Sequence, residues 1–467
     1  MDSKRYFDFS PIYALATPYG KSAIAVFRTS GEGTFDLINK IFSSKLKRED
    51  IKCPQIKYGY IRDNKTGEAV DEVVLSVFPK GHGYTKEEAV EINIHGSLAV
   101  IKKLSKLLEN VGFRQAEGGE FSYRAYKTGT LTLPEAEAVL DIIESTSEKA
   151  TSYALKTRMG FLDKRIEDVY KDIVNLSSLF ELQLDYSEDE FDEDISFPEH
   201  EVDKIKRELK NLVNTYKVSN IVKGGINVIL VGATNAGKST LFNTLLKSNR
   251  SIVSDEKGTT RDYIKESIEI NGVCINLYDT AGINSQARGV EKIGVSRTME
   301  LMNLADVIIH VIPLDDLINE KIDSIESFIP YNLANPDVPT ITVLSKADLT
   351  EEPYPVNITP LVESGAILYS SITKEGIGRI VDTLIKLFYE KINPSSGEVN
   401  DLLIGSTVYN AIKKAYSSIE SILPSSPIEA ITIAIKDALF SLGEVLGKEN
   451  PSDEVLGALF GRFCVGK

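Results

Sequence analysis

The stretch INVILVGATNAGKST, residues 226–240, joins an apolar run to a glycine-rich loop that leads into a helical segment. Its second half fits the pattern G-x-x-x-x-G-K-[ST], in which glycines let backbone N–H groups wrap phosphate groups. Lys238 can neutralise the β- and γ-phosphate oxygens, and Ser239 can ligate Mg²⁺. The order of strand, loop and helix predicts a nucleotide-binding domain built on a parallel sheet.

Three further segments follow in the order that a GTP-binding domain requires. GTTRD supplies Thr260, a candidate second protein ligand for Mg²⁺. In DTAG, Asp279 would reach the metal through water and Gly282 can donate its N–H to the γ-phosphate. In SKAD, Asp348 can accept both N–H donors of guanine, which adenine lacks. The predicted GTP-binding residues are Asn235, Ala236, Gly237, Lys238, Ser239, Thr240, Ser254, Asp255, Glu256, Lys257, Gly258, Thr259, Thr260, Asp279, Thr280, Ala281, Gly282, Ser345, Lys346 and Asp348.

The base-recognition segment departs from its usual pattern at its first position. Ser345 stands where asparagine is usual, so we expect some contacts to the base to be lost. The carboxylate of Asp348 and the stem of Lys346, which can stack on the base, should still favour guanine.

The residues after DTAG lack the usual catalytic glutamine. In Ras-like enzymes this glutamine orients the attacking water, whereas Ile283 and Asn284 follow here. Asn235 is a candidate ligand for a monovalent cation that would supply the charge of an arginine finger. Glu291 can position the water, directly or through another water. The alternative for Glu291 is an acid at a helix start, where the helix dipole favours it.

The spacing of apolar residues divides the chain into segments that predict different domains. Residues 1–120 alternate short β-like runs with one helical stretch and predict a small α+β domain. Residues 121–221 and 390–467 have helical patterning, and residues 222–389 contain short apolar runs separated mostly by helical segments. We therefore expect a multidomain α/β and α protein, in which a Ras-like P-loop G domain is inserted into a helical domain.

Composition and charge limit the classes of protein to which this chain can belong. The net charge of −15 argues against broad coating of nucleic acid but leaves room for recognition of one folded RNA by a local patch. No run of about 18 apolar residues occurs, and the N-terminus has no signal-peptide pattern. Cys53, Cys274 and Cys464 have neither zinc-site spacing nor a disulfide framework. A cytoplasmic protein without a membrane span is expected.

Several stretches together resemble one family across the whole chain. They resemble, in the family's order, the MnmE (TrmE) tRNA modification GTPases: ALATPYGKSAIAVFRTSG, YTKEEAVEINIHGS, GEFSYRAYKTGTLTLPEAEAVLDIIESTSEKA, NAGKSTLFN, GTTRD, DTAG and the terminal FCVGK. The terminal Cys-x-Gly-Lys is specific to this family. The likeness implies a folate-binding N-terminal domain, a helical domain and an inserted G domain.

The resemblance also implies an activity and its partners. The family's members are potassium-activated, Mg²⁺-dependent GTPases that form homodimers through their N-terminal domains. With the flavoprotein MnmG, in a heterotetramer, they add a carboxymethylaminomethyl or aminomethyl group to C5 of the wobble uridine of certain tRNAs. A tetrahydrofolate derivative, either 5-formyl or methylene, supplies the one-carbon unit.

The resemblance assigns a potassium site to the phosphate loop and the following segment. Asn235 corresponds to the side-chain ligand of K⁺. The backbone oxygens of Ser254, Glu256 and Thr259 would complete the ion's shell. Backbone ligation tolerates a change of side chain, so the unusual Glu256 is compatible with this role.

Three residues are candidates for catalytic roles. Glu291 falls on the family's catalytic glutamate, and Arg261 matches an arginine that steadies the site. Cys464, in the terminal FGRFCVGK, is a capable nucleophile, although no neighbouring group that would activate it is visible in the sequence. Composition alone leaves Cys464 as a free thiol, either buried or exposed, whereas the resemblance makes the tail a docked part of the active site.

The family's folate site maps onto both ends of the chain. Its residues correspond to Arg28, Glu91 and the terminal Lys467; the alternative for the first two is an ordinary strand-end ion pair. The family's lysine in this region is Thr130 here, and Lys127 is the candidate to compensate.

Two other functions stay open on the sequence. A ribosome-assembly GTPase shares the G domain, but such proteins usually append an RNA-binding module and lack the terminal Cys-Gly-Lys. The second is a GTP-gated scaffold that recruits MnmG without itself taking part in the chemistry.

Overall fold

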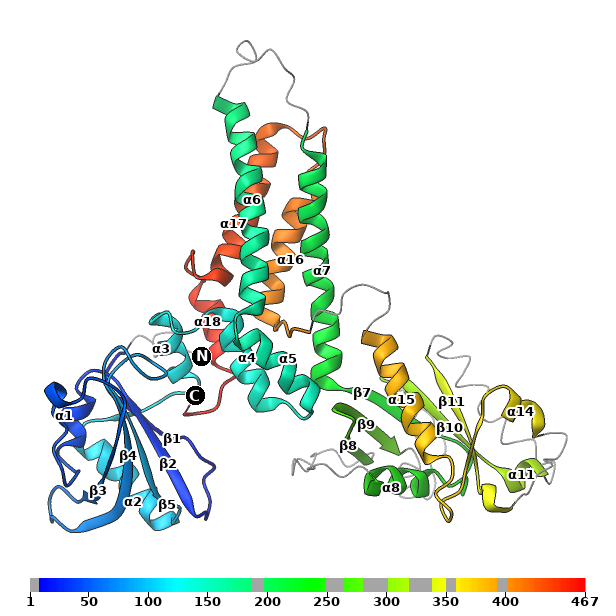
Figure 1. The fold of residues 1–467 in the computed structure, drawn as a ribbon, viewed down its shortest axis with the longest axis horizontal. Coiled ribbons are helices and arrows are strands. Elements are labelled where there is room, and N and C mark those ends of the chain that lie inside the picture. Colours follow the sequence, from blue (N-terminus) through cyan, green and yellow to red (C-terminus); the bar gives the residue numbers. More distant parts are fainter. Residues whose placement is uncertain are drawn as a thin grey trace, which may run out of the picture. The chain divides into compact units, whose positions relative to one another are not determined.

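The computed structural model describes residues 8–185, 197–248, 264–279, 301–318, 338–349, 358–392 and 401–466 (Figure 1). The chain divides into two compact units. The first comprises Met1–Leu140, Lys156–Asn214 and Ile404–Lys467, and the second comprises Asp141–Leu155 and Thr215–Leu403.

The N-terminal part of the first unit is a six-stranded sheet of order β3-β4-β5-β2-β1-β6. Its pairs are antiparallel except for β1 with β6, which is parallel. The strands are β1 (Ile12–Leu15), β2 (Ile24–Ser30), β3 (Gln55–Arg62), β4 (Ala69–Phe78), β5 (Ala89–His95) and β6 (Arg114–Gln115). Short helical segments accompany them: α1 (Thr34–Ile38), η2 (Arg48–Asp50), α2 (Leu98–Val111) and α3 (Glu120–Lys127).

Helix α2 covers one face of this sheet (Figure 1). Its Ile101, Leu104 and Leu108 are spaced three and four residues apart, and they pack into one core with Phe27 and Ile92 of the strands. Because side chains alternate along a strand, Arg28 and Glu91 point to the opposite face. The strand register places these two residues directly opposite each other on β2 and β5.

The rest of the first unit is helical. Its helices, some of which continue into the second unit, are α4 (Leu133–Glu144), α5 (Glu148–Arg158), α6 (Phe161–Asp185), α7 (Glu199–Gly224), α16 (Ser406–Glu420), α17 (Ile428–Leu446) and α18 (Asp453–Phe460). Helix α17 packs against both α6 and α16. Thr132 and Glu135 form a reciprocal capping box at the start of α4, each side chain accepting from the other's backbone N–H at 3.2 Å.

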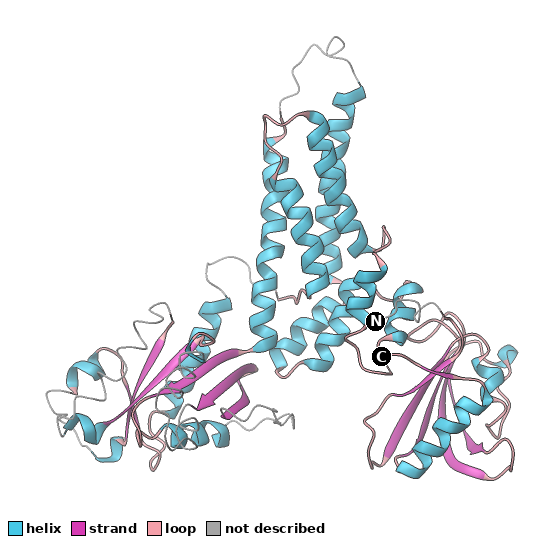
Figure 2. Cartoon of the chain, turned by 180° about the vertical axis from the view of Figure 1, so that it is seen from behind, coloured by secondary structure: helices cyan, strands magenta, loops and turns pink. Residues whose placement is uncertain are grey.

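The second unit contains a six-stranded sheet of order β12-β11-β10-β7-β9-β8 (Figure 2). All its pairs are parallel except β8 with β9, so the predicted parallel sheet is confirmed. The strands are β7 (Ile226–Val231), β8 (Ile264–Ile270), β9 (Val273–Asp279), β10 (Val307–Pro313), β11 (Thr340–Ser345) and β12 (Ile367–Tyr369). The accompanying helices are α8 (Lys238–Ser248), α11 (Leu314–Ile318), η3 (Ala347–Leu349), α14 (Thr359–Glu363) and α15 (Ile377–Ile392).

The core of this sheet comes from the apolar runs that the sequence marks as strands. Leu241 of α8 and Leu384 of α15 pack with Val228 and Val311 in one buried cluster. Among the described residues, no helix is long and apolar enough to cross a membrane. The multidomain α/β and α class expected from the sequence is confirmed by this fold, with a P-loop sheet between helical segments of the chain.

Candidate functional site

The phosphate loop connects β7 to α8 at the carboxyl end of the parallel sheet. Asn235 has a φ of +64° and Gly237 a φ of +93°, so the loop turns its backbone through the left-handed region. Gly232 has a φ of +148°, and a Cβ there would overlap the carbonyl oxygen of Val311 on β10. Only glycine fits at position 232, because the loop leaves the sheet in close contact with the neighbouring strand β10.

Lys238 is folded onto the loop that precedes it. Its Nζ donates to the carbonyl oxygens of Gly232 at 2.9 Å and Ala233 at 2.7 Å. Burial lowers the pKa of the Lys238 ammonium, and the negative charge of Asp279 opposes this shift. The ammonium is thus held among backbone oxygens at the point where the loop can enclose an anion.

Ser239 and Asp279 come together from two elements of the sheet. The Ser239 hydroxyl, in the first turn of α8, donates to Asp279 Oδ2 at 2.7 Å. Asp279 is the last residue of β9 and is buried. Because β7 and β9 are parallel, their carboxyl ends lie at one edge of the sheet and bring these oxygens together. A hydroxyl and a carboxylate are donors of the kind that Mg²⁺ prefers.

The SKAD segment lies at the same edge, after β11. Ser345 is buried, and its hydroxyl donates to the carbonyl oxygen of Ala236 in the phosphate loop at 2.6 Å. The serine at the usual asparagine position therefore ties the base-recognition segment to the phosphate loop. Lys346 has a φ of +61° and pairs with Asp315 at 2.7 Å. Sequence reasoning missed Asp315, although it lies only two residues beyond the end of β10, a strand that ends at this edge.

Asp348 is held by a residue that is distant in the sequence. Its Oδ1 accepts from the hydroxyl of Ser370, just beyond β12, at 2.6 Å. Ser370 is fully buried. The hydrogen bond from Ser370 fixes the position of Oδ1 and thereby holds the Asp348 side chain in one rotamer. Ser370 lies in no motif, so the sequence offered no signal for this contact.

Many predicted residues of the nucleotide site lie outside the described residues. These are Ser254, Asp255, Glu256, Lys257, Gly258, Thr259, Thr260, Arg261, Thr280, Ala281, Gly282 and Glu291. The described part of the site is therefore the phosphate loop, Asp279 and the SKAD segment.

A second polar centre lies on the open face of the N-terminal sheet. The Arg28 Nε donates to Glu91 Oε1 at 2.9 Å, and its Nη1 donates to the backbone oxygen of Gly466 at 3.0 Å. The guanidinium also lies 5.9 Å from the ring centroids of both Tyr84 and Phe121. Arg28 and Glu91, two of the three predicted folate residues, thus form an ion pair, and Arg28 also binds the C-terminal tail.

The tail is docked by backbone contacts. Gly118 forms an antiparallel bridge with Val465, and a Cβ on Gly118 would lie 2.6 Å from the carbonyl oxygen of Phe463. A Cβ on Gly119 would overlap the carbonyl oxygen of Phe460. Both aromatic residues are buried. The tail therefore crosses the start of α3 at a distance that only glycine permits.

The other predicted tail and folate residues have different environments. Cys464 is exposed. The Lys127 ammonium lies 5.6 Å from the ring centroid of Tyr123, and Thr130 Oγ1 lies 3.1 Å from Thr128 Oγ1. No contact among the described residues joins Lys127 to the Arg28 pair. Lys467 lies outside the described residues.

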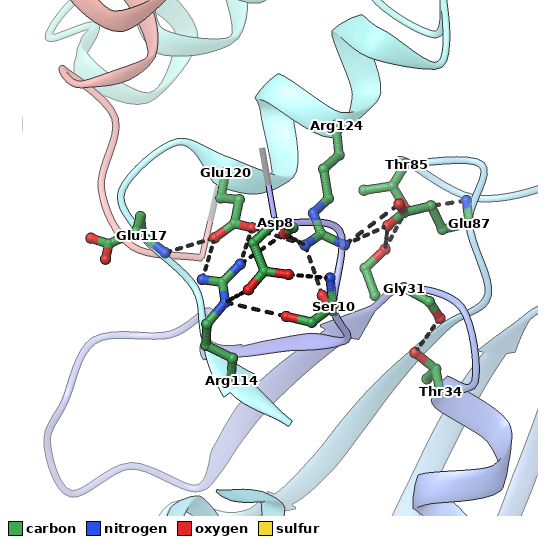
Figure 3. Close-up of polar contacts among 11 residues, drawn as sticks. Asp8, Ser10, Gly31, Thr34, Thr85, Glu87, Arg114, Glu117, Glu120 and Arg124 are labelled. Carbon is green, nitrogen blue, oxygen red and sulfur yellow. Dashed lines mark hydrogen bonds and ion pairs between the residues drawn. The ribbon is translucent and has the colours of Figure 1, made fainter. Parts of the chain in front are cut away.

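A buried ion-pair network beneath α3 was missed by sequence reasoning (Figure 3). Arg124 is 1% exposed and pairs with Glu120 at 2.9 Å and Glu87 at 3.2 Å. Arg114 pairs with the same Glu120 at 2.7 Å. Buried charges persist where they are paired and hydrogen-bonded, and here the pairing fixes α3 against the sheet. The helix that follows Gly119 and bears Phe121 is held in place by these charges.

The fold and the loops define a class of protein first. A parallel sheet with a phosphate loop after β7 and an Asp348 segment after β11 is that of a P-loop GTP-binding protein. The profile described as "GTP-binding protein TrmE N-terminus" matches residues 11–130, and that of the "MnmE helical domain" matches residues 133–464.

Curated relatives match over nearly their full length. The tRNA modification GTPase MnmE of Alkaliphilus oremlandii is 34% identical, over 98% of this chain and 99% of its own. That of Treponema denticola is 34% identical, and that of Borreliella burgdorferi 36%, each over 98% of both chains. The chain belongs to the MnmE family of tRNA modification GTPases, and its class of enzyme is GTPase.

Proposed function

We propose that this chain is a potassium-activated GTPase that acts with MnmG to add a carboxymethylaminomethyl or aminomethyl group to C5 of the wobble uridine of certain tRNAs. The observation that carries the proposal is the hydrogen bond from Arg28 to Gly466 beside Glu91. It joins the terminal motif of this family to the ion pair that would bind a tetrahydrofolate derivative, either 5-formyl or methylene. The chain would work in the cytoplasm.

The GTP site supports the binding roles proposed for its residues. The Lys238 ammonium, released from the loop carbonyls, would move to the β- and γ-phosphates, and backbone N–H groups from Asn235 to Thr240 would line them. Ser239 and Asp279 would hold Mg²⁺, directly and through water, with Thr260 as a second direct ligand. Asp348, held by Ser370, would accept the guanine N–H groups.

Hydrolysis would depend on potassium and on a water-positioning acid. The Asn235 side chain, in a left-handed turn of the loop, would ligate K⁺ together with backbone oxygens of Ser254, Glu256 and Thr259. When bound, the ion supplies positive charge near the transferred phosphate. Glu291 would position the attacking water and Arg261 would steady the site. Glu291→Ala should then slow hydrolysis and leave nucleotide binding intact.

The N-terminal centre would be the folate site. Arg28 and Glu91 are a cation and an anion fixed to each other at 2.9 Å, and the rings of Tyr84 and Phe121 flank the guanidinium. Such a surface suits a flat heterocycle with hydrogen-bonding edges. Lys467 would complete the site after Gly466, and the exposed thiol of Cys464 is accessible to act as a nucleophile there.

The open face of the same sheet supports a homodimer. Exposed side chains on this face include Ile24 at 60%, Ile56 at 73% and Tyr58 at 65%. The register places Tyr58 opposite the exposed Val74. Exposed apolar patches of this kind mark protein interfaces. We propose that a second copy of the chain covers this face; sedimentation of the wild-type chain as a monomer at micromolar concentration would contradict it.

Each part of the chain would have a task of its own. Residues 1–120 would bind folate and dimerise, residues 222–389 would bind and hydrolyse GTP, and residues 121–221 with 390–467 would form the helical domain that carries the Cys-x-Gly-Lys motif. MnmG would bind as the FAD-dependent partner in a heterotetramer.

Nucleoside analysis tests the proposal in cells. tRNA from a strain that lacks this chain should lose the C5 substituent at the wobble uridine, while ribosomal subunit profiles stay normal. A normal wobble uridine with defective subunits would favour a ribosome-assembly GTPase. Restored modification by an Asn235 variant without GTP turnover would favour the scaffold.

A further inference from the structure

The base-recognition segment, residues 345–349, commits its side-chain donors to other parts of the protein. Ser345 ends β11 and is 2% exposed, and its hydroxyl donates to the carbonyl oxygen of Ala236 at 2.6 Å. The same hydroxyl lies 3.4 Å from the carbonyl oxygen of Ile312. A hydroxyl has one proton to donate, so Ser345 cannot give a hydrogen bond to a base while it holds the phosphate loop.

The ammonium of Lys346 is engaged in the same way. Its Nζ lies 2.9 Å from Oδ1 and 2.7 Å from Oδ2 of Asp315, in a partly exposed ion pair. Hydrogen bonds from an ammonium to a carboxylate are stronger than those to a neutral ring nitrogen. The pair therefore keeps the ammonium on Asp315, and the alkyl stem is the part of Lys346 that can contact a base.

Asp348 gives the segment one accessible acceptor. The residue is exposed, and the proton of Ser370 goes to Oδ1 at 2.6 Å, so the lone pairs of Oδ2 can accept from a ligand. The Ser370 hydroxyl accepts in turn from the backbone N–H groups of Ile372 at 3.2 Å and Thr373 at 3.3 Å, and the turn after β12 thereby fixes the carboxylate. The other two residues of the segment are apolar. Residues 345–349 therefore offer a base one fixed carboxylate and no uncommitted side-chain donor.

A single carboxylate matches only part of guanine. The N1–H and the N2 amino group are donors, and both can bind a carboxylate. N7, on another edge of the base, is an acceptor and needs a donor such as an amide N–H. Asparagine at position 345 would have such an N–H, whereas the Ser345 hydroxyl is buried and bonded to Ala236. The segment can therefore recognise the donors of guanine but not N7.

We propose that this site binds guanine nucleotides without a contact to N7, so that guanine nucleotides lacking this acceptor are ligands and substrates equivalent to the natural ones. Ser345 is then a positioning residue, because its hydroxyl holds the backbone of Ala236 in the phosphate loop. From this segment, the base contacts Asp348 and the stem of Lys346. The inference rests on the proposed function, since it concerns the nucleotide that the GTPase binds and hydrolyses.

Two nucleotide analogues test the two edges of the base. Calorimetry of the full chain with Mg²⁺ compares GDP with 7-deaza-GDP, in which C–H replaces N7, and with inosine diphosphate, which lacks the N2 amino group. The Kd of 7-deaza-GDP should lie within about threefold of that of GDP, whereas the Kd of inosine diphosphate should be about tenfold higher, because Asp348 loses one donor. GTP and 7-deaza-GTP should also be hydrolysed at rates within about threefold of each other. A Kd of 7-deaza-GDP above that limit, or a Kd of inosine diphosphate within it, would overturn the proposal.

Ser345→Ala distinguishes a positioning role from a direct contact to the base. If Ser345 only holds the phosphate loop, its removal should raise the Kd of GDP and of 7-deaza-GDP by the same factor, about three- to tenfold. A rise for GDP alone would show that the hydroxyl contacts N7 and would overturn the proposal. Ser364→Ala is the matched control, because its hydroxyl also donates to a backbone carbonyl, that of Leu361 at 2.8 Å, at an exposed helix end of the same unit. It should leave both Kd values within about twofold.

The same measurements separate this inference from the proposed function. If GDP binds and GTP is hydrolysed but 7-deaza-GDP binds more weakly than the threefold limit allows, only this inference fails. If both nucleotides bind and turn over alike but the wobble uridine stays unchanged in a reconstituted reaction, the proposed function fails and the mode of base recognition stands. Absence of GDP binding to the wild-type chain would overturn both.

Discussion

The guanidinium of Arg28 and the backbone oxygen of Gly466 lie 3.0 Å apart, although 438 positions separate the two residues in the chain. Glu91 accepts from the same guanidinium at 2.9 Å. The Arg28 side chain thus donates both to a carboxylate on the sheet and to a backbone oxygen in the tail. The planar fork of arginine makes this possible, because Nε and Nη1 can donate to different acceptors.

Replacement of Arg28 by glutamine should release the tail. A hydrogen bond from a charged donor contributes roughly 1.5–3 kcal/mol, so amide hydrogens of residues 464–466 should exchange about tenfold faster or more. GTP turnover should stay unchanged. Arg62→Gln is the control, because its guanidinium also donates to a glycine carbonyl, that of Gly67 at 3.3 Å, in an exposed turn. Unchanged exchange in Arg28→Gln would show that the tail is held without Arg28.

Gly119→Ala should destabilise the first unit more than Gly129→Ala. Both glycines have positive φ, +74° and +69°, so each substitution costs about 1–2 kcal/mol of backbone strain. Only at Gly119 does the new Cβ overlap the Phe460 carbonyl, which adds about 1–3 kcal/mol; nothing lies within 4 Å at Gly129. Urea midpoints followed by circular dichroism compare the two. Equal midpoints would mean that the tail does not pack against Gly119.

The His95 ring should titrate above its ordinary value. Its Nδ1 lies 2.8 Å from Asp71 Oδ1, and this hydrogen bond, with the negative charge of Asp71, raises the pKa of His95. The contact therefore stabilises the fold at pH values below the ordinary histidine pKa of about 6.5, and the contribution is lost as pH rises through the raised pKa. NMR titration should show a larger fall in the His95 pKa for Asp71→Asn than for Glu72→Gln. The reverse order would contradict this account of the pair.

GTP turnover should be faster in KCl than in NaCl at matched ionic strength, by about tenfold or more. The reason is that Na⁺, which is smaller than K⁺, fits poorly in a coordination shell built for K⁺. Asn235→Gly, which keeps the left-handed turn without strain, should remove the difference and leave nucleotide binding intact. Thr234→Ala, the exposed neighbour in the loop, is the control and should retain it. Equal rates of the wild type in the two salts would exclude the potassium mechanism.

Much of the nucleotide site could be predicted because its parts are local. The phosphate loop lies within nine residues, and the apolar runs of β7, β9, β10, β11 and β12 are long enough to read as buried strands. The edge strand β8, IKESIEI, was not predicted, because an alternation of polar and apolar residues is a weaker signal than a continuous apolar run. Asp315 and Ser370 reach the site only through the order of the strands, which no single segment encodes.

The N-terminal centre was predicted from family resemblance rather than from the residues. Arg28 and Glu91 carry no local signal beyond a strand-end pair, and strand pairing alone brings them together. The network of Arg124, Glu120 and Glu87 also spans distant segments. A buried arginine has the same sequence signature as an exposed one, so its role appears only once the helix is packed.

The most direct measurement is mass spectrometry of the wobble uridine in a reconstituted reaction. tRNA from a strain that lacks this chain would be incubated with MnmG, GTP, KCl, Mg²⁺, glycine or ammonium, and a one-carbon-loaded tetrahydrofolate. The account predicts the added mass of a C5 aminomethyl-type substituent only when the purified chain is present, and its loss with Arg28→Gln. No added mass with the complete mixture, or the same mass without the chain, would contradict the central claim.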